Sequence, residues 1–163
     1  MEATICLLLM CQIINALEIS GGPEKIISKQ QGKQEITQTK MVFNQIVQAL
    51  SVDNWQEKVK PFILAESALA ENTDAKDRTS LINDLGYCHP LFVGRKISLK
   101  DVLVFRSQYR ISGNKQLFKY QGVETCAVVS GKLSTGVVAC FAFSFFVKDG
   151  RYLLWRFDDE TDL

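Results

Sequence analysis

Four segments dense in β-branched and aromatic residues follow one another between residues 101 and 157, and they constrain the fold more than any other feature of this chain. Turn signals separate them at Ser112-Gly113-Asn114, Ser130-Gly131-Lys132 and Asp149-Gly150. Strands joined by such short turns run antiparallel, so the pattern predicts a four-stranded meander. Because Phe141, Phe143 and Phe145 alternate in the third strand, one face of this sheet must be apolar and covered by other elements.

The upstream half of the chain has the spacing of helices that could provide this cover. Apolar residues recur at intervals of three and four from Thr37 to Leu50, which predicts an amphipathic helix. We next expect a short turn at Asp53-Asn54-Trp55 and a weak edge strand at Phe62-Ile63-Leu64. These are followed by a second helix over 77–85 that stops at Gly86, and by a corner at Cys88-His89-Pro90. The predicted fold class is α+β, with N-terminal helices packed in the concave face of a bent, mostly antiparallel sheet of four to six strands.

The first sixteen residues resemble a secretory leader. Residues 5–14 form an apolar run that ends at Asn15-Ala16, where a small residue precedes a cleavage point. We therefore expect residues 1–16 to be a signal peptide and the protein to be secreted to the extracellular space, with no membrane anchor in the mature form; the alternative is a buried N-terminal element. Residues 17–36 are polar, include Gly21-Gly22-Pro23, and are expected to be a flexible lead-in or a frayed helix.

Charge and cysteine content exclude several classes of partner and site. The chain carries 19 basic and 18 acidic residues, a formal charge of +1, which gives no electrostatic case for nucleic acid or an anionic membrane as the main partner. It has a single histidine and no Cys-x-x-Cys spacing, so we expect no metal and no cofactor. Cys126 and Cys140 lie on consecutive predicted strands, where they either form a disulfide across the hairpin or remain two buried thiols.

The order of elements from residue 37 to 158 resembles that of the nuclear transport factor 2-like (SnoaL-like) family. The resemblance rests on the apolar helix 41–50 followed by Asp53-Asn54-Trp55 and Pro61-Phe62, and on the terminal aromatic strand 151–157. It implies a cone-shaped domain over residues 37–158, followed by an acidic tail at 159–163. The cystatin-like fold, in which a four-stranded sheet wraps around one long helix, is the competing interpretation. The second predicted helix favours the nuclear transport factor 2-like fold.

The resemblance also implies a pocket at the open end of the cone, where some members act as isomerases or dehydratases and others only bind. The weak catalytic candidates here are Glu124, Tyr120 and Tyr109, of which Glu124 is the one acid inside an apolar strand. An exposed sheet face is the favoured interpretation of Glu124, and a packing role that of the tyrosines. His89 stands beside Pro90 and suits a structural or surface role.

No set of residues converges on a particular reaction, so an enzyme is not the favoured class. The chain has no phosphate loop, nucleophile elbow or paired-carboxylate motif. The leading hypothesis is a secreted, non-catalytic module that binds an unknown protein or a small apolar ligand, with a homodimer through the sheet face as one form. The alternatives are an isomerase or dehydratase that uses a pocket carboxylate and, if the leader is retained, an intracellular transport carrier. Arg106 and Arg110, with Lys119 opposite, form either an anion-binding patch or an ordinary solvated face.

Overall fold

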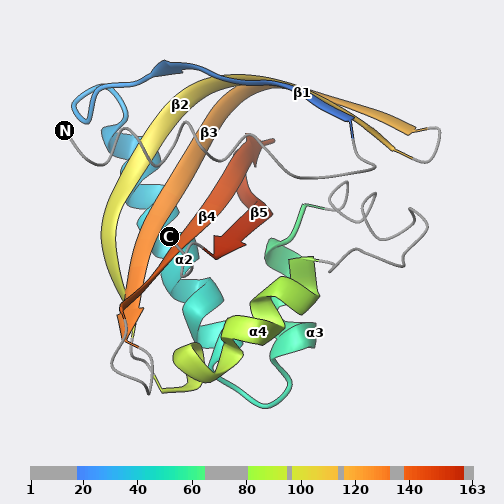
Figure 1. Ribbon diagram of the computed structural model, residues 1–163. Coiled ribbons are helices and arrows are strands. Elements are labelled where there is room, and N and C mark those ends of the chain that lie inside the picture. Colours follow the sequence, from blue (N-terminus) through green and yellow to red (C-terminus); the bar gives the residue numbers. More distant parts are fainter. Residues whose placement is uncertain (1–17, 65–80, 95–96, 114–115, 133–137, 160–163) are drawn as a thin grey trace.

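The protein folds into one open, five-stranded antiparallel sheet with helices against one face (Figure 1). The computed structural model describes residues 18–64, 81–94, 97–113, 116–132 and 138–159. The expected signal peptide, most of the acidic tail and the start of the second predicted helix therefore lie outside the described residues. The elements are β1 (Glu18–Ile26), α2 (Lys33–Leu50), α3 (Trp55–Val59), the 3-10 turn η1 (Lys60–Phe62), α4 (Leu81–Val93), β2 (Ile97–Gly113), β3 (Gln116–Lys132), β4 (Val138–Lys148) and β5 (Arg151–Asp159).

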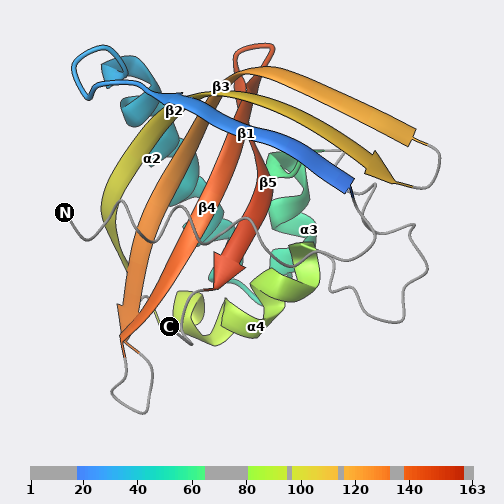
Figure 2. The same cartoon turned by 45° about the horizontal axis from the view of Figure 1, so that its top comes forward.

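The predicted meander is confirmed, and the strands lie in the order β1-β2-β3-β4-β5 (Figure 2). β4 pairs with residues 124–132 of β3, whereas β2 pairs with β3 from residue 116 to 131. The outer halves of β2 and β3, together with β1, consequently extend beyond β4 and β5 in both views. Asp149 and Gly150, with φ of 52° and 73°, form the expected two-residue turn between β4 and β5, because both positions require the left-handed region that Asp-Gly favours.

The helices and the inner face of the sheet enclose one apolar core, which we call the helix-side core. Helix α2 buries Phe43, Ile46 and Leu50 in it, and the predicted Phe141, Phe143 and Phe145 face them from β4. Because side chains alternate along a strand, this core takes the odd-numbered residues of β3 and leaves the even-numbered ones for the other face. The other members are Trp55, Val59, Leu85, Leu91, Phe92, Ala127, Val129, Ala139, Leu154 and Phe157.

The opposite face of the sheet is also apolar over part of its area. A second cluster, which we call the outer cluster, consists of Leu64, Tyr109, Ile111, Tyr120, Phe146 and Trp155. The inner stretch of β3 therefore has buried residues on both faces. Leu64 joins this cluster from the segment after η1, where Ile63 forms a parallel bridge with Leu154 and the Leu64 N–H donates to the Leu154 carbonyl at 2.8 Å. The weak edge strand predicted at Phe62-Ile63-Leu64 is thus a single bridge beside β5.

Three local expectations are wrong. Residues 18–26 form β1 rather than a flexible lead-in, and α2 begins at Lys33, since Lys, Gln and Glu sustain a helix without an apolar period. Helix α4 continues through Gly86, His89 and Pro90 to Val93 instead of stopping. Leu85, Leu91 and Phe92 are buried in the helix-side core, and this packing outweighs the poor helix propensity of glycine and proline.

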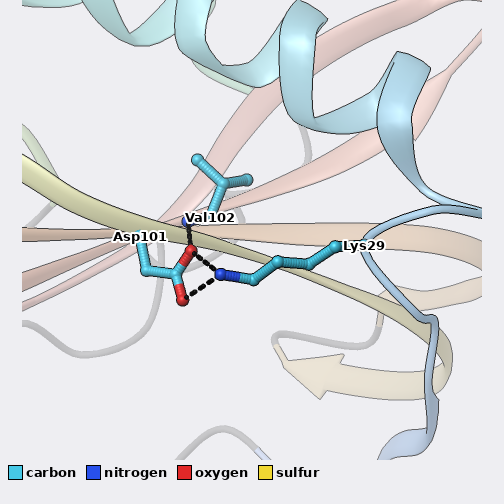
Figure 3. Close-up of polar contacts among 3 residues, drawn as sticks. All are labelled: Lys29, Asp101 and Val102. Carbon is cyan, nitrogen blue, oxygen red and sulfur yellow. Dashed lines mark hydrogen bonds and ion pairs between the residues drawn. The ribbon is translucent and has the colours of Figure 1, made fainter.

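An ion pair ties the segment after β1 to the start of β2 (Figure 3). The Lys29 ammonium lies 2.9 and 3.0 Å from the two carboxylate oxygens of Asp101, and the Val102 N–H donates to the same carboxylate at 2.9 Å. Partial burial opposes the charged form of Asp101, but the bonds from Lys29 and Val102 and the positive charge of Lys29 outweigh it and hold the pKa of that carboxyl below its ordinary value.

Asp101→Asn is expected to lower the free energy of unfolding at neutral pH by about 0.5 kcal/mol, because the pair is largely exposed and screened. A carboxyl with a lowered folded pKa stabilises the protein above its unfolded pKa, and the contribution disappears as the pH falls through the folded pKa. Urea unfolding at pH 7 and at pH 3 measures both effects. A double-mutant cycle with Lys29→Met isolates the pair, and a coupling energy of zero would show that the ion pair contributes nothing.

Candidate functional site

Glu124 is the strongest candidate for a chemically distinctive residue, and it is buried. It lies on β3 opposite Phe105 of β2 and Phe146 of β4, with 4% of its surface exposed. As an even-numbered residue of β3, it points away from the helix-side core and toward the outer cluster. The expectation of an exposed sheet face is therefore wrong at this position, because the aromatic side chains of the neighbouring strands cover the carboxyl group.

Three donors from two strands surround the Glu124 carboxylate. The Ser107 hydroxyl donates to Oε2 at 2.6 Å and the Tyr109 hydroxyl donates to the same oxygen at 3.0 Å. Both lie on β2, two residues apart and hence on one face. The Trp155 indole N–H donates to Oε1 at 3.3 Å. Both oxygens of the carboxylate are thus hydrogen-bonded within the protein, which is the usual requirement for burying a charged group.

Ordinary strand alternation brings Trp155 to this carboxylate. Trp155 shares its face of β5 with Leu153, which also packs against the outer cluster, whereas Leu154 between them enters the helix-side core. The Trp155 ring stacks on Phe146 at a centroid distance of 4.4 Å. A β-bulge follows, because the register between β4 and β5 shifts between Ser144 and Phe145, and beyond it Phe157 joins Leu154 on the helix side.

Burial raises the pKa of the Glu124 carboxyl above its ordinary value. The bonds from Ser107, Tyr109 and Trp155 favour the charged form and act in the opposite direction, as does the positive charge of Arg156, but they do not fully offset the loss of hydration. A raised pKa beside a tyrosine hydroxyl is the arrangement that a general base requires. A general base must also contact its substrate. Only 4% of the surface of Glu124 is exposed, which leaves little room for such a contact.

Tyr120 does not join Glu124, although both face the outer cluster. Its hydroxyl donates to the Val123 carbonyl and accepts the Val147 N–H at 3.1 Å, while its ring stacks on Phe146 at a centroid distance of 3.7 Å. Burial, opposed by the bond with Val147 and reinforced by the nearby Glu124 charge, raises the pKa of Tyr120 to about 12. At physiological pH this hydroxyl is therefore a neutral group that links β3 to β4.

A groove follows β1 along the outer halves of β2 and β3. Residues 20–26 of β1 form one wall, and Tyr109 and Tyr120 are among the residues of the other. Gly21, with φ of 92°, allows the close approach of β1 to β2, since a Cβ at this position would lie 2.1 Å from the Gln108 carbonyl oxygen. Glu124 is not among the lining residues. Of the three candidates, two tyrosines reach the groove and the carboxylate does not.

Cys126 and Cys140 are not opposite each other, and they are thiols rather than a disulfide. Cys126 is buried but Cys140 is exposed, so the expectation of two buried thiols is wrong for Cys140. The predicted turn at Ser130-Gly131-Lys132 would have centred the hairpin between the two cysteines. These three residues instead continue β3 and pair with β4, so Cys126 faces Ser144 and Cys140 faces Ser130. Four residues along the strand, about 13 Å, separate the two positions, which is beyond the reach of a disulfide.

His89 lies in α4 and stacks on the Trp55 ring at a centroid distance of 5.1 Å. Among the described residues, no group of three or more histidine, cysteine, aspartate or glutamate side chains is arranged to hold a metal ion. Within the same ranges, none of the helices combines the length and apolar composition needed to cross a membrane.

Sequence reasoning missed Ser107 and Trp155. Ser107 carries a usable signal, because it shares its strand face with Tyr109 and its register position places it next to Glu124. Trp155 carries a partial signal, because alternation places it on the face of Leu153 and opposite to Leu154, but the sequence does not give the register that brings it to Glu124.

No protein-family model matches the chain, and no curated protein or solved structure matches it either. The nuclear transport factor 2-like assignment therefore rests on the order of elements and the named sequence patterns, and it belongs to the proposal below.

Proposed function

We propose that this chain is a non-catalytic interaction module with a nuclear transport factor 2-like fold, in which a cone-shaped sheet packs around the helices. The observation that carries the proposal is the state of Glu124, the best acid–base candidate in the described residues. Both of its oxygens are bonded to protein donors, 4% of its surface is exposed, and it lies outside the groove. The Phe143 ring, in edge contact with Phe43 and with Phe92, occupies the helix side where the family's pocket would open.

A small-molecule isomerase or dehydratase is the second candidate, favoured by one observation. The Tyr109 hydroxyl lies 3.0 Å from Glu124 and the same residue lines the groove, so a modest movement of the tyrosine would open a path to a carboxyl group with a raised pKa. In that case Glu124 would remove a proton from carbon and Tyr109 would stabilise the resulting oxyanion.

A proton-exchange experiment separates the two candidates without knowledge of the substrate. Cyclohexenone in D₂O exchanges its acidic protons whenever a base in a binding site removes them, and ¹H NMR follows the loss of signal. We expect the full chain to leave the exchange rate unchanged, and Glu124→Gln to give the same rate. An acceleration that Glu124→Gln abolishes, and that the exposed control Glu57→Gln on α3 retains, would overturn the non-catalytic proposal.

Secretion is a separate part of the proposal, supported by the apolar run 5–14 and the small residue Ala16. Expression of the full chain in a secretory cell, followed by mass spectrometry of its N-terminus, tests it. We expect a product in the medium that starts near Leu17. An intact Met1 in the cytosol would contradict secretion and favour an intracellular carrier.

A further inference from the structure

The outer part of the sheet carries a basic patch that the buried Glu124 cluster does not explain. Along β2, residues 105–111 alternate strictly between buried and exposed, and the exposed members are Arg106, Gln108 and Arg110. The register places Lys119 opposite Arg110, Gln121 opposite Gln108, and Lys25 of β1 opposite Arg106. All these side chains are exposed. The basic patch therefore consists of Lys25, Arg106, Gln108, Arg110, Lys119 and Gln121.

Its charges are arranged unfavourably for an isolated protein. Arg110 and Lys119 are direct cross-strand partners, and so are Arg106 and Lys25. Like charges in directly opposite positions destabilise a sheet. Lys29, Lys60 and Arg156 form ion pairs elsewhere in the protein. In the part of the chain that the structure describes, these four cations form none. Glu24, the neighbour of Lys25, lines the same groove but forms no ion pair with these cations in the described ranges, so neither like-charged pair is offset by a salt bridge.

The spacing and composition of the patch indicate the chemistry of a partner. The two cation pairs lie four residues apart on β2, which corresponds to about 13 Å, the same distance that separates side chains i and i+4 on one face of an extended peptide. Gln108 and Gln121 lie between the pairs and offer amide donors and acceptors. Tyr109 and Tyr120 line the same groove as Arg110 and Lys119, but only 7% and 8% of their surfaces are exposed because their rings are packed in the outer cluster. They therefore offer little ring surface on which a base could stack or that could enter a bilayer.

We infer that the basic patch binds an extended acidic segment of a partner protein, with carboxylates on alternate residues. This inference rests on the proposed interaction function and specifies the class of partner. Each like-charged pair would hold one carboxylate, which removes the cross-strand repulsion on binding, and the glutamines would contact the peptide backbone. The binding free energy would come mainly from charge pairing on an exposed surface, so the affinity should fall steeply with salt.

Fluorescence anisotropy with a labelled ten-residue peptide of alternating Asp and Thr tests the inference. We expect saturable binding to the full chain at low salt, weakened at least tenfold by Arg110→Gln/Lys119→Gln. The matched control is Lys33→Gln/Lys58→Gln, which removes the same charge from exposed positions on α2 and α3 and should change the affinity less than twofold. Equal weakening by the control, or equal binding of an Asn-Thr peptide, would overturn the inference.

Two further measurements complete the test. The first asks whether another polyanion binds the basic patch, and the second needs no ligand. Binding of heparin or of vesicles with 30% anionic lipid, without binding of the Asp-Thr peptide, would overturn the assignment to an acidic protein segment and leave the proposed non-catalytic function intact. In the absence of any ligand, Arg110→Glu should raise Tm by roughly 1–3 °C, because it converts a repulsive cross-strand pair into an attractive one. An unchanged or lower Tm would show that the pair is not under repulsion and would remove the argument for an anionic partner.

Discussion

Phe143→Ala is expected to lower the free energy of unfolding by about 3–5 kcal/mol, the range measured when a large buried aromatic side chain is truncated. Phe143 is fully buried and its ring joins three elements of the helix-side core. It meets Phe43 of α2 at a centroid distance of 5.4 Å, Phe92 of α4 at 5.9 Å and Phe157 of β5 at 4.8 Å. The truncation therefore leaves a cavity between helices and sheet that no single neighbour can fill.

Urea unfolding followed by tryptophan fluorescence measures this loss. Val138→Ala, on the same strand but 62% exposed, is the matched control and should change the free energy by less than about 0.5 kcal/mol. If Phe143→Ala does not fold, Phe143→Leu provides the test, with an expected loss of about 1–2 kcal/mol because more of the volume is retained. Equal losses at positions 138 and 143 would contradict the role assigned to this core.

Glu124→Ala is expected to lower the free energy of unfolding by about 3 kcal/mol or more, since a buried donor that loses its acceptor costs about 1–3 kcal/mol. Ser107, Tyr109 and Trp155 would lose this acceptor together. Chemical denaturation of the variant checks the value, with the exposed Glu24→Ala as the control. A loss below about 1 kcal/mol would mean that water or repacking replaces the carboxylate at little cost.

The same carboxylate predicts a pH dependence of stability. Because burial raises the folded-state pKa, the folded protein holds a proton on Glu124 that the unfolded chain has already released, and stability falls as the pH rises from the unfolded pKa to the raised folded one. Glu124→Gln lacks this ionisation, so the advantage of the natural protein over the variant should shrink as the pH rises through that window. Unfolding at a series of pH values tests this, and an advantage that grows with pH would show that the donors lower the pKa instead.

The sheet could be predicted from the sequence because its signals are local. Alternating phenylalanines in β4 and the Asp149-Gly150 turn each specify backbone geometry within a few residues, and both occur as expected. Helix α4 could not be predicted in full, since Gly86 and Pro90 oppose the helix locally and only burial of Leu91 and Phe92 in a core assembled from distant elements overrides them. β1 was missed for a related reason, because its partner in β2 lies more than eighty residues away.

The sequence indicated which residue types the candidate site contains but not how their side chains are arranged. The isolated acid in an apolar strand drew attention to Glu124, and the structure bonds one of the two tyrosine candidates, Tyr109, to it. Tyr120 does not join Glu124, because its hydroxyl bonds to the backbone of β3 and β4. The pairing of the cysteines failed because the hairpin centre is displaced by two residues, which moves each residue of β4 by four positions relative to β3.

The two edges of the sheet have a consequence for how this protein can associate. At one edge, β1 contains Gly21, Gly22 and Pro23 and a register shift between Pro23 and Lys25, features that interrupt the row of backbone donors and acceptors that another strand would need. At the other, the Leu154 carbonyl of β5 is already bonded to Leu64, and the Arg151 guanidinium donates to the Pro61 carbonyl at 3.1 Å. Addition of a foreign strand is therefore disfavoured along β1 and beside Leu154 of β5, whereas residues 116–123 of β3 extend beyond β4 and form an edge that β4 does not cover.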